Sequence, residues 1–274
     1  MKWLRLSEIY LKSMRVGIIF MMLLTTASAI AQVSDVFHYI CPPVNKDSEK
    51  LFLLGNRYLK KKMWSEAIIS YSGSLKLDSG FCDIYYDLSW AYELNGTISK
   101  AIEILQIADA RGLQNSNLAY NWVQLPLGRL WLAANNLEQS LHFYQKSMSL
   151  TPLEADSYYG ASVVLNKLKR NEEALNVLNK GRELESNRRP HIQFFAGILN
   201  YEIGEYEKAI QELQPVYKQF SKDPMMNSYL GLAYFQKGDD YFDKARIYLV
   251  RAKKLGSPPD STVEKTLGLV KTKR

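Results

Sequence analysis

The side chains with the widest chemical repertoire in this sequence are three histidines, two cysteines and a few paired carboxylates. His38, His142 and His191 lie far apart, and none belongs to an H-E-x-x-H motif or to an arrangement with cysteines that would suggest a metal site. The sequence also contains no glycine-rich phosphate loop and no G-x-S-x-G nucleophile motif. We therefore expect no catalytic residue, no bound metal and no cofactor.

Two carboxylate pairs, Glu172-Glu173 and Asp239-Asp240, have the residue types needed for general acid–base chemistry. Both pairs occur where predicted helical turns meet, and we interpret them as solvated charges. An enzyme of unrecognised type stays as an alternative, because the absence of motifs does not by itself exclude catalysis.

The N-terminus predicts export. An uncharged apolar run, Val16 to Leu24, follows Arg15 and leads to Ala29-Ile30-Ala31, which fits cleavage of a signal peptide before Gln32. Ala27-Ser28-Ala29 is a second candidate cleavage site, and Met14 is an alternative start. We expect a periplasmic protein of a Gram-negative bacterium; the alternative is a membrane anchor formed by residues 16–31, a stretch shorter than the roughly 20 residues that span a bilayer.

Export changes the interpretation of Cys41 and Cys82, because a disulfide can persist in an oxidising compartment. The two cysteines are a candidate disulfide. The alternative is that Cys82 is a small buried residue and Cys41 a free thiol.

The net charge of +7 is concentrated at the two ends of the chain. Residues 1–31 carry +3 and residues 244–274 carry +7, which leaves −3 for residues 32–243. A basic surface over the whole molecule is thereby excluded, and we expect no nucleic-acid partner.

A pattern of about 34 residues recurs through the rest of the chain. Leu54-Gly55-Asn56-Arg57-Tyr58 is followed by Ser65-Glu66-Ala67-Ile68, and Leu230-Gly231-Leu232-Ala233-Tyr234 is followed by Asp243-Lys244-Ala245. These blocks resemble the tetratricopeptide repeat, a pair of antiparallel helices. Six copies can be assigned, at 48–81, 82–115, 121–154, 155–188, 190–223 and 224–259.

The spacing of apolar residues agrees with this resemblance. Positions 4, 7, 8 and 11 of each copy share one face of a first helix, and positions 20, 24 and 27 share one face of a second. Small residues at position 8 allow close approach of the two helices, and large residues at position 24 fill the remaining space. We predict an all-α, right-handed superhelical solenoid of about six repeats.

The ends of the array differ from the repeats. Residues 1–31 are the predicted signal peptide and residues 32–47 an extended lead-in. Residues 260–274 are predicted to form a capping helix and a basic tail, because Val263, Leu267 and Val270 share one helical face.

Two prolines depart from the pattern. Pro126 falls at position 6 of the third copy, so its first helix either starts late or kinks. Pro215 raises the same question for the second helix of the fifth copy.

The resemblance implies a concave surface lined by positions 2, 5, 9 and 12 of the first helices. In this chain these positions are rich in aromatic residues, as in the anchors of protein interfaces. The candidate groove residues are Phe52, Asn56, Tyr86, Trp90, Trp122, Arg129, Tyr159, His191, Phe194, Tyr201 and Phe235. The alternative is that a tight superhelix, the lead-in or the cap buries them as core.

One activity of the family is absent on sequence grounds. Members that grip a C-terminal carboxylate use five Lys, Asn and Arg positions of the first three repeats. Only Asn56 matches; the others hold Phe52, Asp87, Trp122 and Pro126.

The sequence therefore predicts a non-catalytic scaffold or assembly factor of the cell envelope that binds a protein or peptide in an aromatic groove. The alternative is an adaptor for an envelope polymer or membrane surface through Lys265, Lys271, Lys273 and Arg274. Membrane contact is expected only through this tail or an uncleaved signal. The sequence does not predict the partner or the oligomeric state.

Overall fold

The computed structural model describes residues 41–113, 122–184, 189–256 and 261–272, and within these ranges the chain forms helices and no strand. The predicted signal peptide and residues 32–40 lie outside the described residues. The all-helical repeat fold predicted from the sequence is confirmed.

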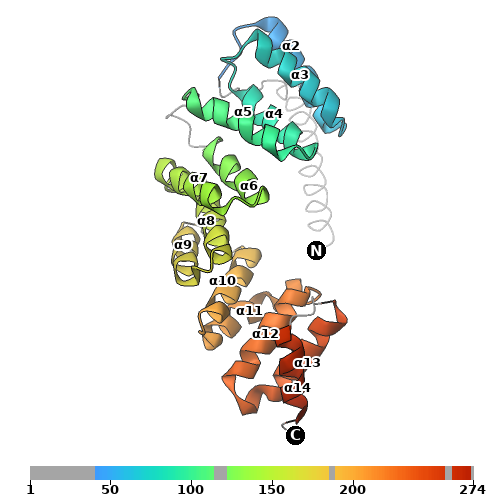
Figure 1. Cartoon of the computed structure of the whole chain (residues 1–274), viewed down its shortest axis with the longest axis vertical. Helices are drawn as coiled ribbons and strands as arrows, with labels where there is room; N and C mark the ends of the chain where they lie inside the picture. Colours follow the sequence, from blue (N-terminus) through green and yellow to red (C-terminus); the bar gives the residue numbers. More distant parts are fainter. Residues whose placement is uncertain (1–40, 114–121, 185–188, 257–260, 273–274) are drawn as a thin grey trace, which may run out of the picture.

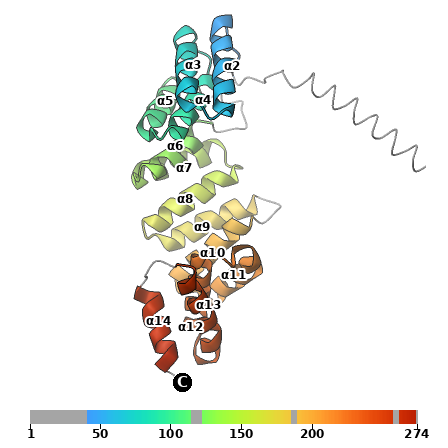
Figure 2. The same ribbon diagram turned by 90° about the vertical axis from the view of Figure 1, so that its right-hand side faces the viewer.

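The helices of these described ranges pair as six successive hairpins, followed by one further helix. The pairs are α2 (Lys46–Lys60) with α3 (Trp64–Leu77), α4 (Asp83–Leu94) with α5 (Ile98–Ala110), α6 (Gln124–Ala133) with α7 (Leu137–Leu150), α8 (Ala155–Lys167) with α9 (Asn171–Glu183), α10 (Pro190–Glu202) with α11 (Tyr206–Phe220), and α12 (Pro224–Lys237) with α13 (Phe242–Lys254). A short 3-10 helix, η1 (Asp239–Tyr241), fills the turn of the sixth hairpin, and α14 (Ser261–Thr272) follows it. Figures 1 and 2 show the hairpins stacked along the long axis, from α2 and α3 at one end to α14 at the other.

In four of the six described hairpins, a glycine of the first helix faces a large side chain of the second. A Cβ atom added to Gly55 would lie 2.5 Å from the Tyr71 ring, and one added to Gly197 would lie 2.5 Å from Leu213. No real side chain fits at that distance, so glycine is required for this approach of the helices. The same pairing recurs at Gly231 and Leu249.

Between hairpins, buried side chains form a chain of apolar clusters. Phe52 and Tyr71 of the first hairpin share one cluster with Ile84 and Leu88 of the second. Each hairpin therefore covers apolar surface that its neighbour leaves open, which is how a solenoid obtains its stability.

The last helix closes the array. Val263 and Leu267 of α14 are buried against Leu232 of α12 and Leu249 of α13. This is the position of a capping helix, beside α12 and α13 in Figure 2.

The two prolines have different consequences. Helix α6 begins at Gln124, so Pro126 is its third residue, where a backbone N–H has no intrahelical acceptor in any case. The helix therefore starts late. Helix α11 instead continues through Pro215 to Phe220.

Candidate functional site

An apolar pocket of about 540 Å³ opens on the first helices of the second, third and fourth hairpins. Its volume is in the usual range of ligand sites. The lining comes from α4, from α6 and the turn before it, from one residue of α7, and from α8. It consists of Tyr86, Trp122, Leu125, Pro126, Arg129, Leu132, Tyr144, Asp156, Tyr159, Gly160 and Val163.

Four of the predicted groove residues meet in this pocket: Tyr86, Trp122, Arg129 and Tyr159. They come from three successive repeats, and stacking of the hairpins brings them to one face. Trp90 lies one turn after Tyr86 on α4, and the two side chains are 45% and 40% exposed. Trp90 therefore extends the apolar surface beyond the pocket.

Ion pairs hold the charged groups at the pocket. Arg129 donates to Glu93 of α4, with one guanidinium nitrogen 2.6 Å from Oε2, and this hydrogen bond raises the pKa of Arg129. Arg189 donates to Asp156 Oδ1 at 2.5 Å. Because these two arginines each contact a carboxylate, we interpret the pocket as apolar with a charge-balanced rim.

Sequence reasoning missed Tyr144 as a pocket residue, because it belongs to a second helix. Its ring packs closely against glycines of both α6 and α8. A Cβ atom added to Gly128 would lie 2.8 Å from the ring, and one added to Gly160 would overlap it. Burial raises the pKa of Tyr144 to about 12, against the opposing effect of Arg129, so the phenol stays neutral at physiological pH. The sequence feature that could have indicated Tyr144 is a large residue at position 24 in a copy that has a glycine, Gly128, at position 8.

Phe52 does not belong to the groove, and its prediction is corrected. Its side chain is 3% exposed, and its ring lies 4.8 Å from that of Phe81 and 5.7 Å from that of Tyr71, centroid to centroid. Phe81 precedes α4 and packs over the face of α2 that the repeat pattern assigned to the groove. Asn56 lies about one helical turn after Phe52 on α2, and its side-chain oxygen accepts a hydrogen bond from the Tyr71 hydroxyl at 2.5 Å.

Three aromatic residues predicted for the groove pack on rings of neighbouring helices instead of lining the pocket. Phe194 lies 5.1 Å from Phe220, and Phe235 is stacked on Phe242 at 5.2 Å. Tyr201 contacts the rings of Tyr206 and Tyr229. Trp122 lines the pocket but is only 3% exposed, so it forms part of its floor.

Two of the histidines lie in the described part of the chain. His191 is exposed and its ring meets the Tyr159 ring edge-on at 5.7 Å, beside the pocket. His142 is exposed on α7, and His38 lies outside the described residues. Over the described ranges, no three His, Cys, Asp or Glu side chains gather as a metal site would require, and no helix has the length and apolarity to span a membrane.

The basic C-terminus is described only in part. Lys265 is exposed on α14, and Lys253 contacts Glu264 at 2.9 Å. The side chains of Lys271, Lys273 and Arg274 lie outside the described residues.

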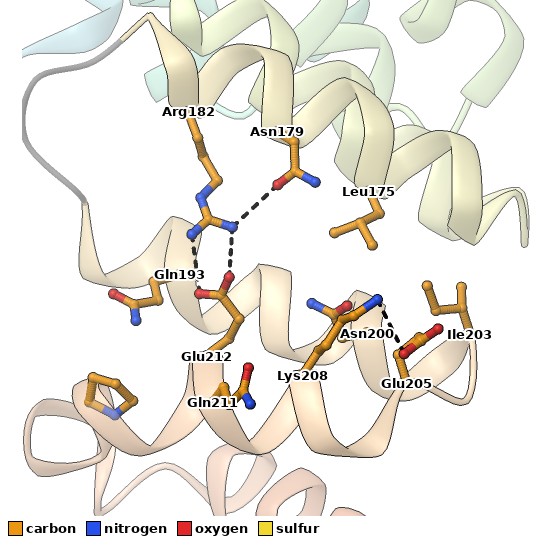
Figure 3. Close-up of a pocket in the computed structure, with 11 residues that line it drawn as sticks. Leu175, Asn179, Arg182, Gln193, Asn200, Ile203, Glu205, Lys208, Gln211 and Glu212 are labelled. Carbon is orange, nitrogen blue, oxygen red and sulfur yellow. Dashed lines mark hydrogen bonds and ion pairs between the residues drawn. The ribbon is translucent and has the colours of Figure 1, made fainter.

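A second, polar cleft of about 640 Å³ lies between α9 and α11, with α10 behind it (Figure 3). It was not predicted from the sequence.

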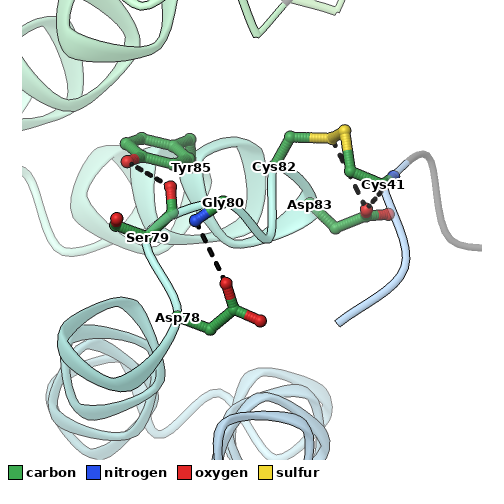
Figure 4. Close-up of a disulfide and its surroundings, with 7 residues drawn as sticks. All are labelled: Cys41, Asp78, Ser79, Gly80, Cys82, Asp83 and Tyr85. Carbon is green, nitrogen blue, oxygen red and sulfur yellow. Dashed lines mark hydrogen bonds between the residues drawn. A yellow bond between two sulfur atoms is a disulfide. The ribbon is translucent and has the colours of Figure 1, made fainter. Parts of the chain in front are cut away.

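Cys41 and Cys82 form a disulfide, with their Cα atoms 5.4 Å apart (Figure 4). The Cys41 N–H also donates to Asp83 Oδ2 at 3.0 Å, and the Val44 N–H donates to Asp78 Oδ2 at 2.8 Å. The covalent ring between the cysteines contains α2 and α3, so the first hairpin is tied to the start of α4.

Comparison with known proteins supports the repeat assignment. No family model matches the sequence. Superkiller protein 3 of Schizosaccharomyces pombe is 22% identical over 154 residues, which is 52% of this chain but only 11% of that protein. Among solved structures, a tetratricopeptide repeat protein from Parabacteroides merdae has a TM-score of 0.61 and 13% identity, over 82% of this chain and 99% of that one.

Another structure similar to this chain is that of YrrB, a tetratricopeptide-repeat protein with an unusual peptide-binding site. Its TM-score is 0.53 with 18% identity, over 73% of this chain and 94% of that one. At these identities the similarity shows the fold.

Stacked helical hairpins, closed by an extra helix, define the class of α-helical repeat solenoids. With the repeat pattern, these structural neighbours show that the chain has the tetratricopeptide-repeat fold.

Proposed function

We propose that this chain is a non-catalytic scaffold or assembly factor of the cell envelope, which binds a protein or peptide in the pocket between α4, α6 and α8. The observation that carries the proposal is the pocket itself. Residues from three successive first helices line about 540 Å³ of largely apolar space, and Tyr86 and Trp90 are exposed at and beside it. Solvent-exposed aromatic side chains of this kind are typical anchors of protein interfaces.

The ion pairs at the rim indicate which kind of partner side chain enters the pocket. Arg129 is held by Glu93 and Arg189 by Asp156, so a charged ligand group would have to break an ion pair. An uncharged apolar side chain fits the pocket without that cost. The peptide-binding site of YrrB adds support, since that protein has the same fold.

Affinity capture of the protein from its own cells tests this proposal. The variant Tyr86→Ala with Trp90→Ala removes the two exposed rings and leaves the buried core unchanged. We expect it to lose at least tenfold of the captured partner, because aromatic anchors carry most of the binding energy of an interface.

The matched control is Ile69→Ala with Ile247→Ala, which removes two exposed apolar side chains from second helices. This control is expected to capture as much partner as the wild type. Equal loss in both double variants, or no loss in either, would contradict the assignment of the pocket. Circular dichroism of all three proteins checks the fold.

Export is part of the proposal. It is supported by the apolar segment before Ala29-Ile30-Ala31 and by the Cys41–Cys82 disulfide, which suits an oxidising compartment. N-terminal sequencing of the mature protein is expected to begin at Gln32; an intact N-terminus would instead support the anchor formed by residues 16–31.

A further inference from the structure

The turn of the first hairpin carries four basic side chains within six residues. Arg57 and Lys60 lie in the last turn of α2, and Lys61 and Lys62 follow before α3 begins. All four side chains are exposed, and within the described residues none of them forms an ion pair. These four residues form a basic tip on a hairpin that lies at one end of the stack (Figures 1 and 2).

The turns of the later hairpins do not concentrate positive charge in this way. In the fourth hairpin, Arg170 is paired with Glu173. The turns of the fifth and sixth hairpins, residues 202–208 and 237–243, contain more acidic than basic residues. Residues 57–62, by contrast, contain no acidic residue. The basic tip is therefore a property of the first hairpin and not of hairpin turns in general.

The end of a helix explains only part of this charge. Arg57 and Lys60 complement the negative end of the α2 dipole, as basic residues in a last turn usually do. Lys61 and Lys62 follow the last residue of the helix. Half of the basic tip therefore needs another explanation.

Lys62 also has a backbone conformation that is unfavourable for lysine. Its φ angle is 59°, in the left-handed region that suits glycine and asparagine best. The corresponding turn residues of the second, third and fifth hairpins are Gly96, Asn135 and Gly204. A lysine in this conformation costs free energy, and such positions occur most often where a side chain has a function. The fourth hairpin has a lysine there as well, Lys169, which provides a matched control.

Apolar side chains are exposed beside the basic tip. Met63 follows Lys62 directly and is 37% exposed. The connection from α3 to α4 is short, so α4 runs back along α3 and ends near the same turn, where Leu94 is 40% exposed. Basic residues around exposed apolar side chains are typical of surfaces that bind anionic membranes. A nucleic acid would pair with the charges but would offer Met63 and Leu94 no apolar medium.

The charge of the neighbouring repeats favours contact through this end. Residues 46–77 contain seven basic and three acidic residues, a net charge of +4. Residues 78–243 contain 15 basic and 21 acidic residues, a net charge of −6. An anionic surface therefore attracts the first hairpin and repels the repeats that follow it.

We propose that the basic tip is a membrane contact, and that its partner is a bilayer surface rich in anionic phospholipid. The four basic side chains contact lipid phosphates, while Met63 and Leu94 enter the interface. None of these residues lines the apolar pocket, so the protein can hold a partner and a membrane at once. The contact is also separate from the basic C-terminal tail, which follows the helix at the other end of the stack.

Cosedimentation with lipid vesicles tests this contact on the exported protein purified from its own cells. The vesicles contain equal parts of phosphatidylglycerol and phosphatidylcholine, or phosphatidylcholine alone. In the variant, Lys60→Gln and Lys61→Gln are combined with Lys62→Asn, because asparagine tolerates the left-handed backbone. We expect the variant to bind the anionic vesicles about a hundredfold more weakly, since each basic residue near such a surface contributes about fivefold.

The matched control combines Lys167→Gln, Lys169→Asn and Lys180→Gln. It removes three exposed basic side chains, one of them at the same turn position in the fourth hairpin. We expect this control to bind the anionic vesicles as the wild type does. Circular dichroism of all the proteins checks the fold, and the capture of a partner at the pocket is measured separately.

Four results would overturn the proposal. The first is equal binding of the anionic vesicles by the wild type and the Lys60–Lys62 variant. The second is an equal loss in the control, which would mean that only net charge matters. The third is a loss confined to Lys265→Gln with Lys271→Gln, which would assign the contact to the C-terminus. The fourth is binding of double-stranded DNA as tight as that of the anionic vesicles, which would show a site for any polyanion.

Discussion

At the scale of single residues, Tyr144 connects the apolar pocket to the core of its hairpin. Its ring is 4% exposed and passes close to two glycines, Gly128 on α6 and Gly160 on α8. The ring therefore sets how closely α7 approaches both first helices. The shape of the pocket depends on these two glycines as much as on the residues that line it.

Gly160→Ala is expected to destabilise the protein, although alanine normally favours a helix. The added methyl group overlaps the Tyr144 ring, and such overpacking costs about 1–3 kcal/mol. The control is Gly268→Ala on α14, where no atom lies within 4 Å of the added Cβ and a small gain in stability is expected. Urea unfolding compares the two; a Gly160→Ala protein as stable as the wild type would contradict this role of Tyr144.

Asp87 on α4 is a second residue whose effect on stability can be measured, because its pKa is shifted. Burial, with a smaller contribution from Asp83, raises its pKa to about 7. The unfolded chain has a pKa near 4 for aspartate, so folding favours the protonated form. The contribution of Asp87 to stability is therefore largest below pH 4, falls as the pH rises to 7, and stays at its lowest above that.

Asp87→Asn should remove this pH dependence. We expect the variant to match the wild type near pH 4 and to exceed it by roughly 3–4 kcal/mol at pH 8. Urea midpoints between pH 4 and 8 measure the difference, with the exposed Asp240→Asn as control. A constant difference at all pH values would show that Asp87 does not titrate as described.

Individual residues were predictable only where the repeat geometry alone decides their surroundings. Tyr86 and Tyr159 share a position of the first helix, so stacking places both at the pocket. Phe52 was mispredicted because Phe81, in the connection before α4, covers it. No periodicity records such a contact made by a connecting segment.

At the scale of elements, the first hairpin is the one that is covalently closed. Among the described helices of other hairpins it packs mainly against α4, through α3, and the Cys41–Cys82 disulfide ties its start to the same helix. Cross-linking a loop of this length contributes about 4 kcal/mol in the chain-entropy model. The disulfide therefore adds a covalent link to the packing of α3 on α4.

Removal of the disulfide should loosen this hairpin selectively. In Cys41→Ser with Cys82→Ala, we expect faster hydrogen exchange in α2 and α3 and unchanged exchange in α8 to α13. Mass spectrometry of peptic peptides reports this directly. Uniformly faster exchange would mean that the array unfolds as one unit, and no change would mean that packing alone holds α2 and α3.

The helix pairs themselves were largely predictable, because each follows from apolar spacing and small residues at fixed positions. The late start of α6 also follows from Pro126. The polar cleft could not be predicted, because it depends on the separation of α9 and α11, which belong to different repeats.

At the scale of the whole molecule, the protein is an elongated stack with an apolar pocket on α4, α6 and α8 and a polar cleft on α9 to α11. A solenoid of this kind has one continuous core but several exposed surfaces, so its repeats can serve different ligands. We propose that the pocket and the adjoining Tyr86 and Trp90 receive a protein partner.

Site-specific photocrosslinking in living cells tests whether a partner binds at this pocket. A photoreactive phenylalanine analogue at Trp90 would lie beside the pocket. The control places the same analogue at Ile69, a residue of α3 that is 72% exposed. We predict a discrete crosslinked protein from position 90 and none from position 69. Crosslinks of equal yield from both positions, or from position 69 alone, would show that the partner does not bind at the pocket.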